Sequence, residues 1–292
     1  MIGLKRGTVL LCRHQPEWEA EARNTMARLR GILGDVIQDI EHVGSTAIPA
    51  IQAKPIIDIA VAVDHFRDVL VYEGALQAAG FYYRPQAGLP NQLLFGCGSF
   101  YEGTGDLQTH FIHVVHTDSP EWVNYINFRD YLNRTPSAAK AYEALKESLA
   151  KQAPVDRGRA KYLAGKHQFI VRTQRKALAA SYLGKTVAIQ IDRPLGSAHP
   201  EHPGLIYPVN YGYLPGVTSG DGEDLDVYLL GVDTPVQAYT ARVIGMVHRR
   251  NDTEDKLIAA PMGCTFDKRE IAEQVSFQEK YFDSEIEVYD AK

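Results

Sequence analysis

Four carboxylates crowded into one short segment, SGDGEDLDVYLLG, are the side chains of this 292-residue sequence with the clearest capacity for chemistry. Asp221, Glu223, Asp224 and Asp226 stand there directly in front of an apolar run. Like charges this close repel one another unless a cation lies among them. The segment is therefore either a well-solvated turn or the rim of a site for a hard metal ion.

A fifth carboxylate lies inside a predicted strand. The stretch KPIIDIAVAV has continuous branched apolar residues, which are typical of a strand buried on both faces, and Asp58 interrupts it. An ionised aspartate without a partner is costly there, so Asp58 needs a metal, a cation or good hydrogen-bond donors. The alternative is an aspartate at a strand edge, hydrogen-bonded to neighbouring backbone amides.

Three histidines close the stretch THFIHVVH, which is typical of another strand. Side chains alternate along a strand, so His110 and His116 share one face and His113 takes the other. The three therefore cannot all bind one ion from a regular strand. Each is either a packed, hydrogen-bonded histidine or a contributor to a pocket on its own face.

Composition limits the class of protein. Apolar residues make up 45% and charged residues 23% of the chain, as in globular proteins. The three cysteines are far apart and form no Cys-x-x-Cys pair, which predicts neither disulfides nor a structural zinc site. The apolar run in the opening MIGLKRGTVLLC is too short for a signal sequence, and no longer one follows. We therefore expect a cytoplasmic protein without a membrane partner.

Charge differs between the two halves of the chain. Up to about Ala177 there are 21 basic and 18 acidic residues, and after it 10 and 18, so the net charges are +3 and −8. A mildly basic half suits a phosphate-bearing ligand, and an acidic half suits divalent cations or is simply a solvated surface. Because the second half repels phosphate backbones and the first has no basic run, no nucleic-acid partner is expected.

Several elements must position these side chains. Residues 16–33 place Trp18, Met26 and Leu29 near one helical face behind a proline, and DVIQDIEHVGST predicts a strand that leads into a Gly-Ser turn. Three helical stretches follow the histidine strand. From KTVAIQIDRPLG onward, short strands divided by glycine and proline predict a small barrel.

The segments HVGSTAIPAIQAKPIIDI, THFIHVV and YLAGKHQFIV resemble the GrpB family, whose members are predicted to be nucleotidyltransferase-like. In that wider superfamily a Gly-Ser turn contacts nucleotide phosphates, and paired aspartates hold magnesium. The resemblance assigns Gly44, Ser45 and Asp58 to these roles. Ala60 stands at the position of the second aspartate. Further pocket residues that the resemblance implies are Glu41, His42, Lys54, Lys166, His110 and His113.

The segments IDRPLGS, IYPVNYGYLPG, SGDGEDLDVYLLG and EDKLIAAP resemble the family I inorganic pyrophosphatases, which are barrels that hydrolyse pyrophosphate with magnesium. That family binds the metal through the pattern Asp-x-Asp-x-x-Asp. Here Asp221, Glu223 and Asp226 occupy those positions. The resemblance implies two further metal-binding aspartates, for which RRNDTEDK offers Asp252, Glu254 and Asp255, and we take Asp252 as the candidate ligand. The glutamate reaches one methylene farther than an aspartate, which would displace the ion or water that it serves.

The same resemblance implies a set of substrate contacts. Arg193 matches an arginine on pyrophosphate, Lys256 matches a lysine on the electrophilic phosphate, and Tyr207 and Tyr211 line the pocket. With Glu223 and Asp226, this makes Arg193, Lys256 and Tyr211 the candidate catalytic residues. Upstream strands with further ligands are missing, so the barrel is a shortened version.

Together these features predict an α+β protein of two domains. Residues 1–175 form a nucleotidyltransferase-like mixed sheet with helices, and residues 184–292 form a pyrophosphatase-like barrel of the oligonucleotide-binding type. The expected activity is magnesium-dependent hydrolysis of pyrophosphate by the barrel, coupled to transfer from a nucleoside triphosphate to an unknown acceptor in the first domain. The alternative is a degenerate regulatory protein that binds nucleotide or pyrophosphate. Both hypotheses are compatible with a homo-oligomer.

Overall fold

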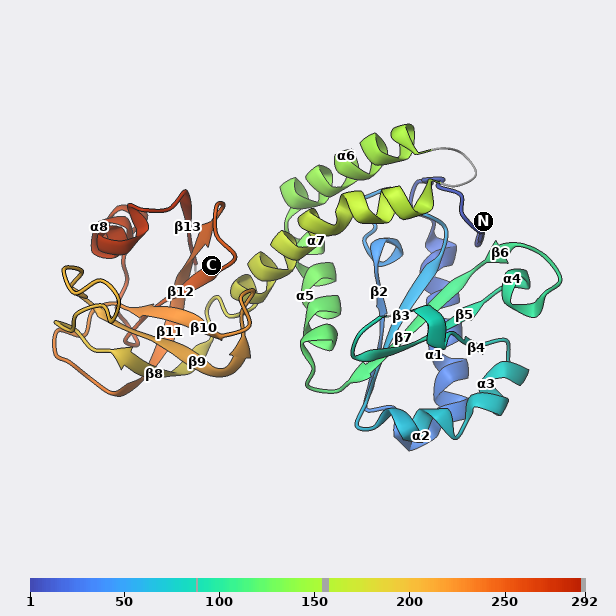
Figure 1. The fold of residues 1–292 in the computed structure, drawn as a ribbon, viewed down its shortest axis with the longest axis horizontal. Coiled ribbons are helices and arrows are strands. Elements are labelled where there is room, and N and C mark those ends of the chain that lie inside the picture. Colours follow the sequence, from blue (N-terminus) through green and yellow to red (C-terminus); the bar gives the residue numbers. More distant parts are fainter. Residues whose placement is uncertain (88, 154–157, 290–292) are drawn as a thin grey trace. The chain divides into compact units, whose positions relative to one another are not determined.

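The computed structural model describes residues 1–87, 89–153 and 158–289, and the chain divides into two compact units. Unit 1 comprises residues 1–170 and unit 2 residues 171–292, with the elements of both labelled in Figure 1. Helix α7 (Arg159–Ser181) runs through the boundary, as the lack of turn residues there predicts. Within the described ranges, no helix has both the length and the apolar character needed to cross a membrane.

Unit 1 is built on a five-stranded mixed sheet with the order β2-β3-β7-β5-β4. The neighbours β3 and β7 are parallel, and the other pairs are antiparallel. The bounds are Asp39–Val43 (β2), Ile57–Val63 (β3), Tyr82–Tyr83 (β4), Gln92–Cys97 (β5) and His110–His116 (β7). Every residue of β3 except Asp58 is buried, which confirms the strand predicted to be covered on both faces.

Helices pack on both faces of this sheet. On one face the predicted helix α1 buries Trp18 in a core that includes Ile59. On the other face α5 brings Tyr125 to within 5.0 Å, ring centre to ring centre, of His113. The helices and the small β1–β6 sheet of this unit have the bounds Pro16–Leu33 (α1), Phe66–Leu70 (α2), Glu73–Ala78 (α3), Ser99–Glu102 (α4), Pro120–Arg134 (α5), Pro136–Gln152 (α6), Leu4–Lys5 (β1) and Leu107–Gln108 (β6).

Unit 2 is a closed barrel of five strands. Their order is β12-β10-β9-β8-β11, and β11 pairs again with β12 to close the ring, while β13 adds to the edge of β11. The bounds are Thr186–Arg193 (β8), Asn210–Thr218 (β9), Asp224–Leu229 (β10), Ala238–Arg249 (β11), Asp255–Ala260 (β12), Lys268–Glu279 (α8) and Ser284–Val288 (β13). The α+β class and the small second barrel are therefore confirmed.

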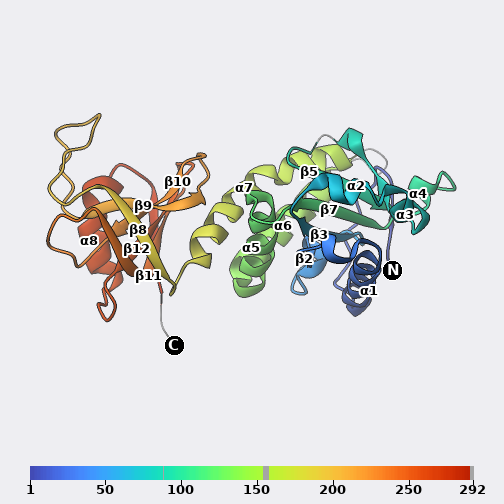
Figure 2. The same cartoon turned by 90° about the horizontal axis from the view of Figure 1, so that it is seen from below.

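The barrel strands have an apolar layer on each face. One layer contains Val227 and Leu257, and the alternate residues Tyr228 and Ile258 belong to a second layer. Helix α8 covers this second layer with Ile271, and Figure 2 shows the helix lying along the strands. Side chains on the strand face that carries Tyr228 and Ile258 are therefore buried under α8, although they point away from the layer that contains Val227 and Leu257.

The close contact between β8 and β9 generates a first prediction. A Cβ on Gly212 would lie 1.9 Å from the backbone oxygen of Gln190, which no rotamer change can relieve. We expect Gly212→Ala to lower the free energy of unfolding by about 1–3 kcal/mol or more. Gly204→Ala is the matched control, because nothing lies within 4 Å of its Cβ position. Urea unfolding measures both, and equal stabilities of the two variants would contradict the close pairing of β8 with β9.

Lys146 generates a second prediction, on pH. Its ammonium lies buried in α6, where it donates to the backbone oxygen of Gln52, and burial, helped by Lys166, lowers its pKa to about 7. Between about pH 7 and the higher pKa of the unfolded chain, the unfolded state binds the proton more tightly, so stability rises with pH across this window. We expect Lys146→Met to remove this rise. Denaturant unfolding of both proteins at pH 7 and pH 9.5 tests it, and identical pH dependence would contradict the assignment.

Candidate functional site

The ammonium of Lys256 is the centre of a buried polar cluster in unit 2. Its Nζ lies 2.6 Å from Tyr211 Oη, 2.5 Å from Asp226 Oδ2 and 2.7 Å from Glu254 Oε2. Tyr211 also donates to the same Asp226 oxygen. Because Lys256 is only 1% exposed, these oxygens take the place of water around its charge.

Three neighbouring strands bring these side chains together. Strands β10 and β12 are parallel, and Val227 lies opposite Leu257. Asp226 and Lys256, each one residue earlier, therefore lie side by side on the same face. Strand β9 supplies Tyr211 from the other side of β10. A slip of one residue in either pairing would turn one of the partners to the opposite face.

The two carboxyl groups beside Lys256 have opposite pKa shifts. Burial alone would raise the pKa of Asp226, but Lys256 and the hydrogen bonds that Asp226 accepts hold it below its ordinary value. Burial and the hydrogen bond with Asp226 raise the pKa of Glu254 to about 8. At neutral pH the pair therefore carries one proton and one negative charge. Burial also raises the pKa of Tyr211, which keeps its hydroxyl a donor.

A second buried cation, Arg249, lies next to this cluster, and no sequence pattern indicated it. It is 2% exposed, and its Nη2 lies 2.7 Å from Glu279 Oε1. Its Nη1 lies 2.9 Å from Asp252 Oδ2 and 3.8 Å from Glu254 Oε2. Tyr228 donates to Glu279 at 2.6 Å. Asp252, a predicted metal ligand, is thus paired with a guanidinium.

Arg193 and Tyr207 lie close to the same cluster. The ring of Tyr207 is buried, with its centre 5.3 Å from that of Tyr211. Burial raises the pKa of Tyr207, and the nearby charges of Arg193 and Asp226 act on it as well. Arg193 donates from Nη1 to Asp192 at 2.8 Å, whereas its buried Nε has no hydrogen-bond partner among the described residues. A buried donor without a partner suits an oxyanion ligand.

The predicted trio of metal-binding carboxylates is not assembled. Asp221 and Glu223 are exposed in the turn between β9 and β10, where Asp221 Oδ1 accepts from the Glu223 amide at 3.0 Å. Asp224 accepts from the Gly216 amide at 3.0 Å, which is a hairpin role. Of the four crowded carboxylates, only Asp226 belongs to the buried cluster.

The fit of this site to magnesium rests on its paired carboxyl groups. In the described part of the chain, no three or more His, Cys, Asp or Glu side chains are arranged to hold a metal ion. Asp226 and Glu254, however, are hydrogen-bonded to each other and share a proton that a divalent cation could replace. Magnesium is often held by one or two carboxylates together with substrate phosphates. The pair therefore fits magnesium that arrives with a phosphate ligand.

In unit 1, Asp58 faces the turn that follows β2. Gly44 has a φ of +71°, and a Cβ there would lie 2.5 Å from Asp58 Oδ2, so this approach requires glycine. Ser45 follows at the start of the short 3-10 helix η2 (Ser45–Ala47). From β7, His113 Nε2 lies 3.7 Å from Asp58 Oδ1. The predicted Gly-Ser turn, the aspartate and one histidine are thus neighbours.

The other predicted histidine of the pocket lies elsewhere. His110 Nε2 lies 3.2 Å from Thr25 Oγ1 and 3.4 Å from Glu21 Oε1, on the face of the sheet that α1 covers. His110 and His113 therefore do not meet, as the alternation along β7 dictates. The remaining predicted residues Lys54 and Lys166 both contact the ring of Tyr162.

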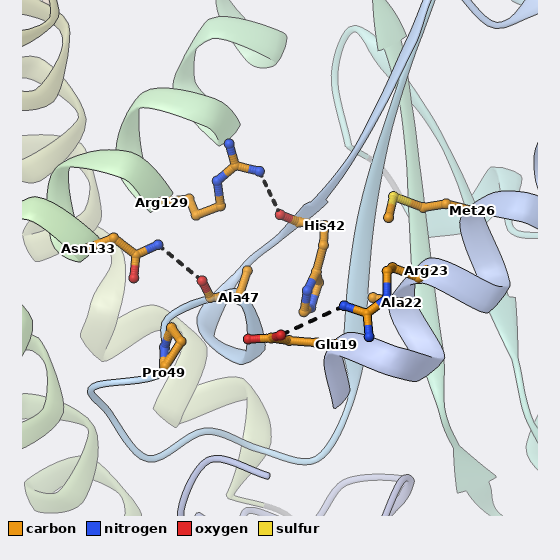
Figure 3. Close-up of a pocket in the computed structure, with 9 residues that line it drawn as sticks. All are labelled: Glu19, Ala22, Arg23, Met26, His42, Ala47, Pro49, Arg129 and Asn133. Carbon is orange, nitrogen blue, oxygen red and sulfur yellow. Dashed lines mark hydrogen bonds and ion pairs between the residues drawn. The ribbon is translucent and has the colours of Figure 1, made fainter. Parts of the chain in front are cut away.

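A cavity of about 390 Å³ lies beside the Gly44–Ser45 turn, between α1, β2 and α5. Figure 3 shows the His42 ring projecting into it, with Arg129 and Asn133 entering from α5. Arg129 is held by Glu41 at 2.6 Å and by the backbone oxygen of His42 at 2.9 Å. Burial lowers the pKa of His42 to about 4, so its ring is neutral at pH 7. The lining residues are Glu19, Ala22, Arg23, Met26, His42, Ala47, Pro49, Arg129 and Asn133.

Comparison with known proteins divides the chain in the same way. Residues 8–176 match the family model described as GrpB protein, and residues 181–287 match the model described as inorganic pyrophosphatase. The glutamate-rich protein GrpB of Alkalihalophilus pseudofirmus is 36% identical over 171 residues, which cover 58% of this chain and 96% of that protein.

Two further relatives belong to one half each. The crystal structure of the conserved protein GrpB from Enterococcus faecalis is 28% identical with a TM-score of 0.52, and the match covers 59% of this chain and 99% of that one. An inorganic pyrophosphatase of Saccharolobus solfataricus is 38% identical over 81 residues, which cover 26% of this chain and 44% of that protein. The chain therefore belongs to the GrpB family, and its GrpB domain is followed by a pyrophosphatase-like domain.

Proposed function

We propose that unit 2 hydrolyses inorganic pyrophosphate at the cluster around Lys256. The observation that carries the proposal is a buried ammonium held by Tyr211, Asp226 and Glu254. Arg193, whose Nε has no hydrogen-bond partner among the described residues, supplies a second positive group close by. The match of residues 181–287 to the pyrophosphatase model supports the same chemistry.

The side chains divide the work of hydrolysis between them. A bond forms between a water oxygen and one phosphorus, the bond from that phosphorus to the bridging oxygen breaks, and two orthophosphates result. Lys256 and Arg193 balance the charge that develops on the phosphoryl group and on the leaving phosphate. Asp226, kept ionised by Lys256, orients the water and accepts its proton. Tyr207 and Tyr211, whose buried rings lie beside the cluster, shield it from solvent.

Magnesium would be held by the paired carboxyl groups of Asp226 and Glu254, together with oxygens of pyrophosphate. When bound, it adds charge neutralisation on the phosphates. Asp221 and Glu223 lie on the exposed turn that leads into β10, so their part in metal binding requires a rearrangement of that turn. Asp252 would have to leave Arg249 to serve as a ligand.

A second candidate function is nucleotidyl transfer in unit 1. The observation in its favour is the forced approach of the Gly44 turn to Asp58, which sets a backbone turn and Ser45 beside a carboxylate. Nucleotidyl transfer from a nucleoside triphosphate releases pyrophosphate, so hydrolysis by unit 2 would pull that reaction forward. The unidentified acceptor would occupy the cavity beside His42. Ala60 leaves this site with one aspartate where the superfamily has two.

The alternative is a regulatory protein that binds pyrophosphate or a nucleotide without turnover. Binding of a ligand to the folded state alone raises its stability by mass action. Thermal stabilisation by pyrophosphate with magnesium, without phosphate release, would favour this alternative. Release of phosphate favours the hydrolase.

Replacement of one carboxylate tests the hydrolase directly. Asp226→Asn keeps the shape of the side chain but removes the charge that faces Lys256, and we expect phosphate release from pyrophosphate to fall roughly 10²–10³-fold. Asp233→Asn, at an aspartate beyond β10 and outside the cluster, is the matched control and should leave the rate unchanged. Equal rates for both variants would place the chemistry elsewhere.

Removal of magnesium makes a separate prediction. We expect excess EDTA to stop phosphate release by the full chain and added magnesium to restore it, because two cationic side chains cannot neutralise a pyrophosphate anion by themselves. A thermal unfolding curve in EDTA checks that the fold persists. Phosphate release that continues in EDTA would mean that Lys256 and Arg193 suffice without metal.

A further inference from the structure

We propose that Ser197 and His199 bind the phosphate group of pyrophosphate that lies farther from Lys256. Both residues belong to the segment between β8 and β9, called the 194–207 loop below. The sequence patterns assign a role to neither side chain. The inference rests on the proposed site of pyrophosphate hydrolysis in unit 2 and adds two substrate contacts to it.

Backbone hydrogen bonds hold the 194–207 loop in a regular form. The Gly196 amide donates to the backbone oxygen of Tyr207 at 2.8 Å, and the Tyr207 amide donates to that of Ser197 at 2.9 Å. Farther along, the His199 amide donates to the backbone oxygen of Leu205 at 2.8 Å. The two arms of the loop thus pair as a short antiparallel ladder, so the directions of their side chains follow from strand alternation.

Alternation sorts the side chains of this ladder onto two faces. Ala198 pairs with Ile206, and both residues are exposed. Ser197 and His199 flank Ala198, so they point to the opposite face, which carries the buried Tyr207. The rings agree with this arrangement, because those of His199 and Tyr207 are nearly parallel, at 8°, with centres 6.2 Å apart. Ser197 and His199 therefore lie on the buried face of the loop, beside Tyr207.

Tyr207 links this face to the cluster around Lys256. Its ring centre lies 5.3 Å from that of Tyr211, and Tyr211 Oη lies 2.6 Å from Lys256 Nζ. Arg193, at the end of β8, directly precedes the loop. A diphosphate held by Lys256 at one end and by Arg193 at the other would therefore lie along Tyr207. Its second phosphate would face Ser197 and His199.

Ser197 has unused hydrogen-bonding capacity on this face. Its Oγ is buried and has no hydrogen-bond partner among the described residues. Buried hydroxyl groups in folded proteins normally have a partner, because leaving one unpaired costs free energy. A phosphate oxygen beside Tyr207 would accept from this hydroxyl and supply the partner.

His199 is held so that its ring presents a donor. The backbone amides of Glu201 and His202 both donate to His199 Nδ1, each at 3.2 Å. Because Nδ1 accepts these bonds, the ring hydrogen lies on Nε2, which makes no hydrogen bond among the described residues. The loop thus offers two neutral donors, one hydroxyl and one imidazole, next to the positive charge of Arg193. Such a set suits the oxygens of a phosphate group.

The test is calorimetric titration of the full chain with methylenediphosphonate and magnesium, a diphosphate that cannot be hydrolysed. We expect Ser197→Ala and His199→Phe each to weaken binding about tenfold, since each removes one hydrogen bond to the ligand. His199→Phe keeps a ring against Tyr207 and removes only the donor. His199→Gln returns an N–H donor and should recover most of the affinity. With pyrophosphate as substrate, Ser197→Ala and His199→Phe should raise KM more than they lower kcat.

Two comparisons separate a contact with the ligand from a structural role. His202→Phe makes the same change at an exposed side chain of the loop, keeps the backbone amide that holds His199, and should leave the affinity unchanged. Ser197→Ala should not lower the melting temperature of the unliganded chain, because its hydroxyl has no partner there to lose. A lowered melting temperature with unchanged affinity would assign Ser197 to the fold and overturn its place in the site.

The outcomes also distinguish this inference from the hydrolysis on which it rests. If the unaltered chain binds methylenediphosphonate but releases no phosphate from pyrophosphate, the proposed hydrolysis fails. Weaker binding by Ser197→Ala and His199→Phe would still support the two contacts. If pyrophosphate is hydrolysed and both variants keep the affinity and KM of the unaltered chain, the two contacts are overturned and hydrolysis at Lys256 stands. Absence of methylenediphosphonate binding by the unaltered chain overturns them as well.

Discussion

The need to surround a buried ammonium with oxygen atoms organises the second unit. Lys256 lies on the barrel face that α8 and its apolar layer cover, where an unpaired charge could not persist. The register of three strands supplies Tyr211 and Asp226, and Glu254, directly before β12, completes the set. The pairings of β9, β10 and β12 thus build part of the barrel and assemble the candidate site, so the fold and the chemistry share these pairings.

The two units treat buried charge in opposite ways. In unit 2, Lys256 and Arg249 are each paired with carboxyl groups. Burial and the neighbouring Asp226 raise the pKa of Glu254, so Glu254 retains a proton. In unit 1, the ammonium groups of Lys54 and Lys166 lie near the ring of Tyr162, and Arg159 donates to the amide oxygen of Gln108, without carboxylate partners among the described residues. A saturated site can exchange partners with an arriving metal and phosphate, whereas an unsaturated one lacks a counter-ion. Both arrangements suit a phosphate ligand. In unit 2 the ligand would exchange with carboxylate partners, and in unit 1 it would supply the negative charge that the basic side chains lack.

Local pattern was enough to predict the elements, but not every partner of the functional side chains. The period of α1, the buried strand around Asp58 and the short strands of the barrel follow directly from the spacing of apolar residues. Alternation along β7 likewise predicted that His110 and His113 point apart. Asp226 and Lys256 were assigned through the resemblance to the family I inorganic pyrophosphatases, and the register of β10 and β12 places them side by side.

Other features depend on contacts between distant segments and left little trace in the sequence. Arg249 ends an apolar strand, and only its pairing with Glu279, thirty residues later, shows that it is buried. Asp221 and Glu223 match a metal-binding spacing, yet the exposed hairpin turn keeps them outside the cluster. Arg84 and Arg159 meet at Phe111 from segments that no local motif connects.

The central claim is that Lys256 serves pyrophosphate hydrolysis, and phosphorus NMR of the full chain with magnesium and pyrophosphate tests it most directly. The account predicts that the pyrophosphate signal is replaced by orthophosphate, and that Lys256→Met, with its fold checked by thermal unfolding, leaves pyrophosphate intact. Orthophosphate formation by Lys256→Met at the rate of the unaltered chain would contradict it, as would a pyrophosphate signal that the unaltered chain never diminishes.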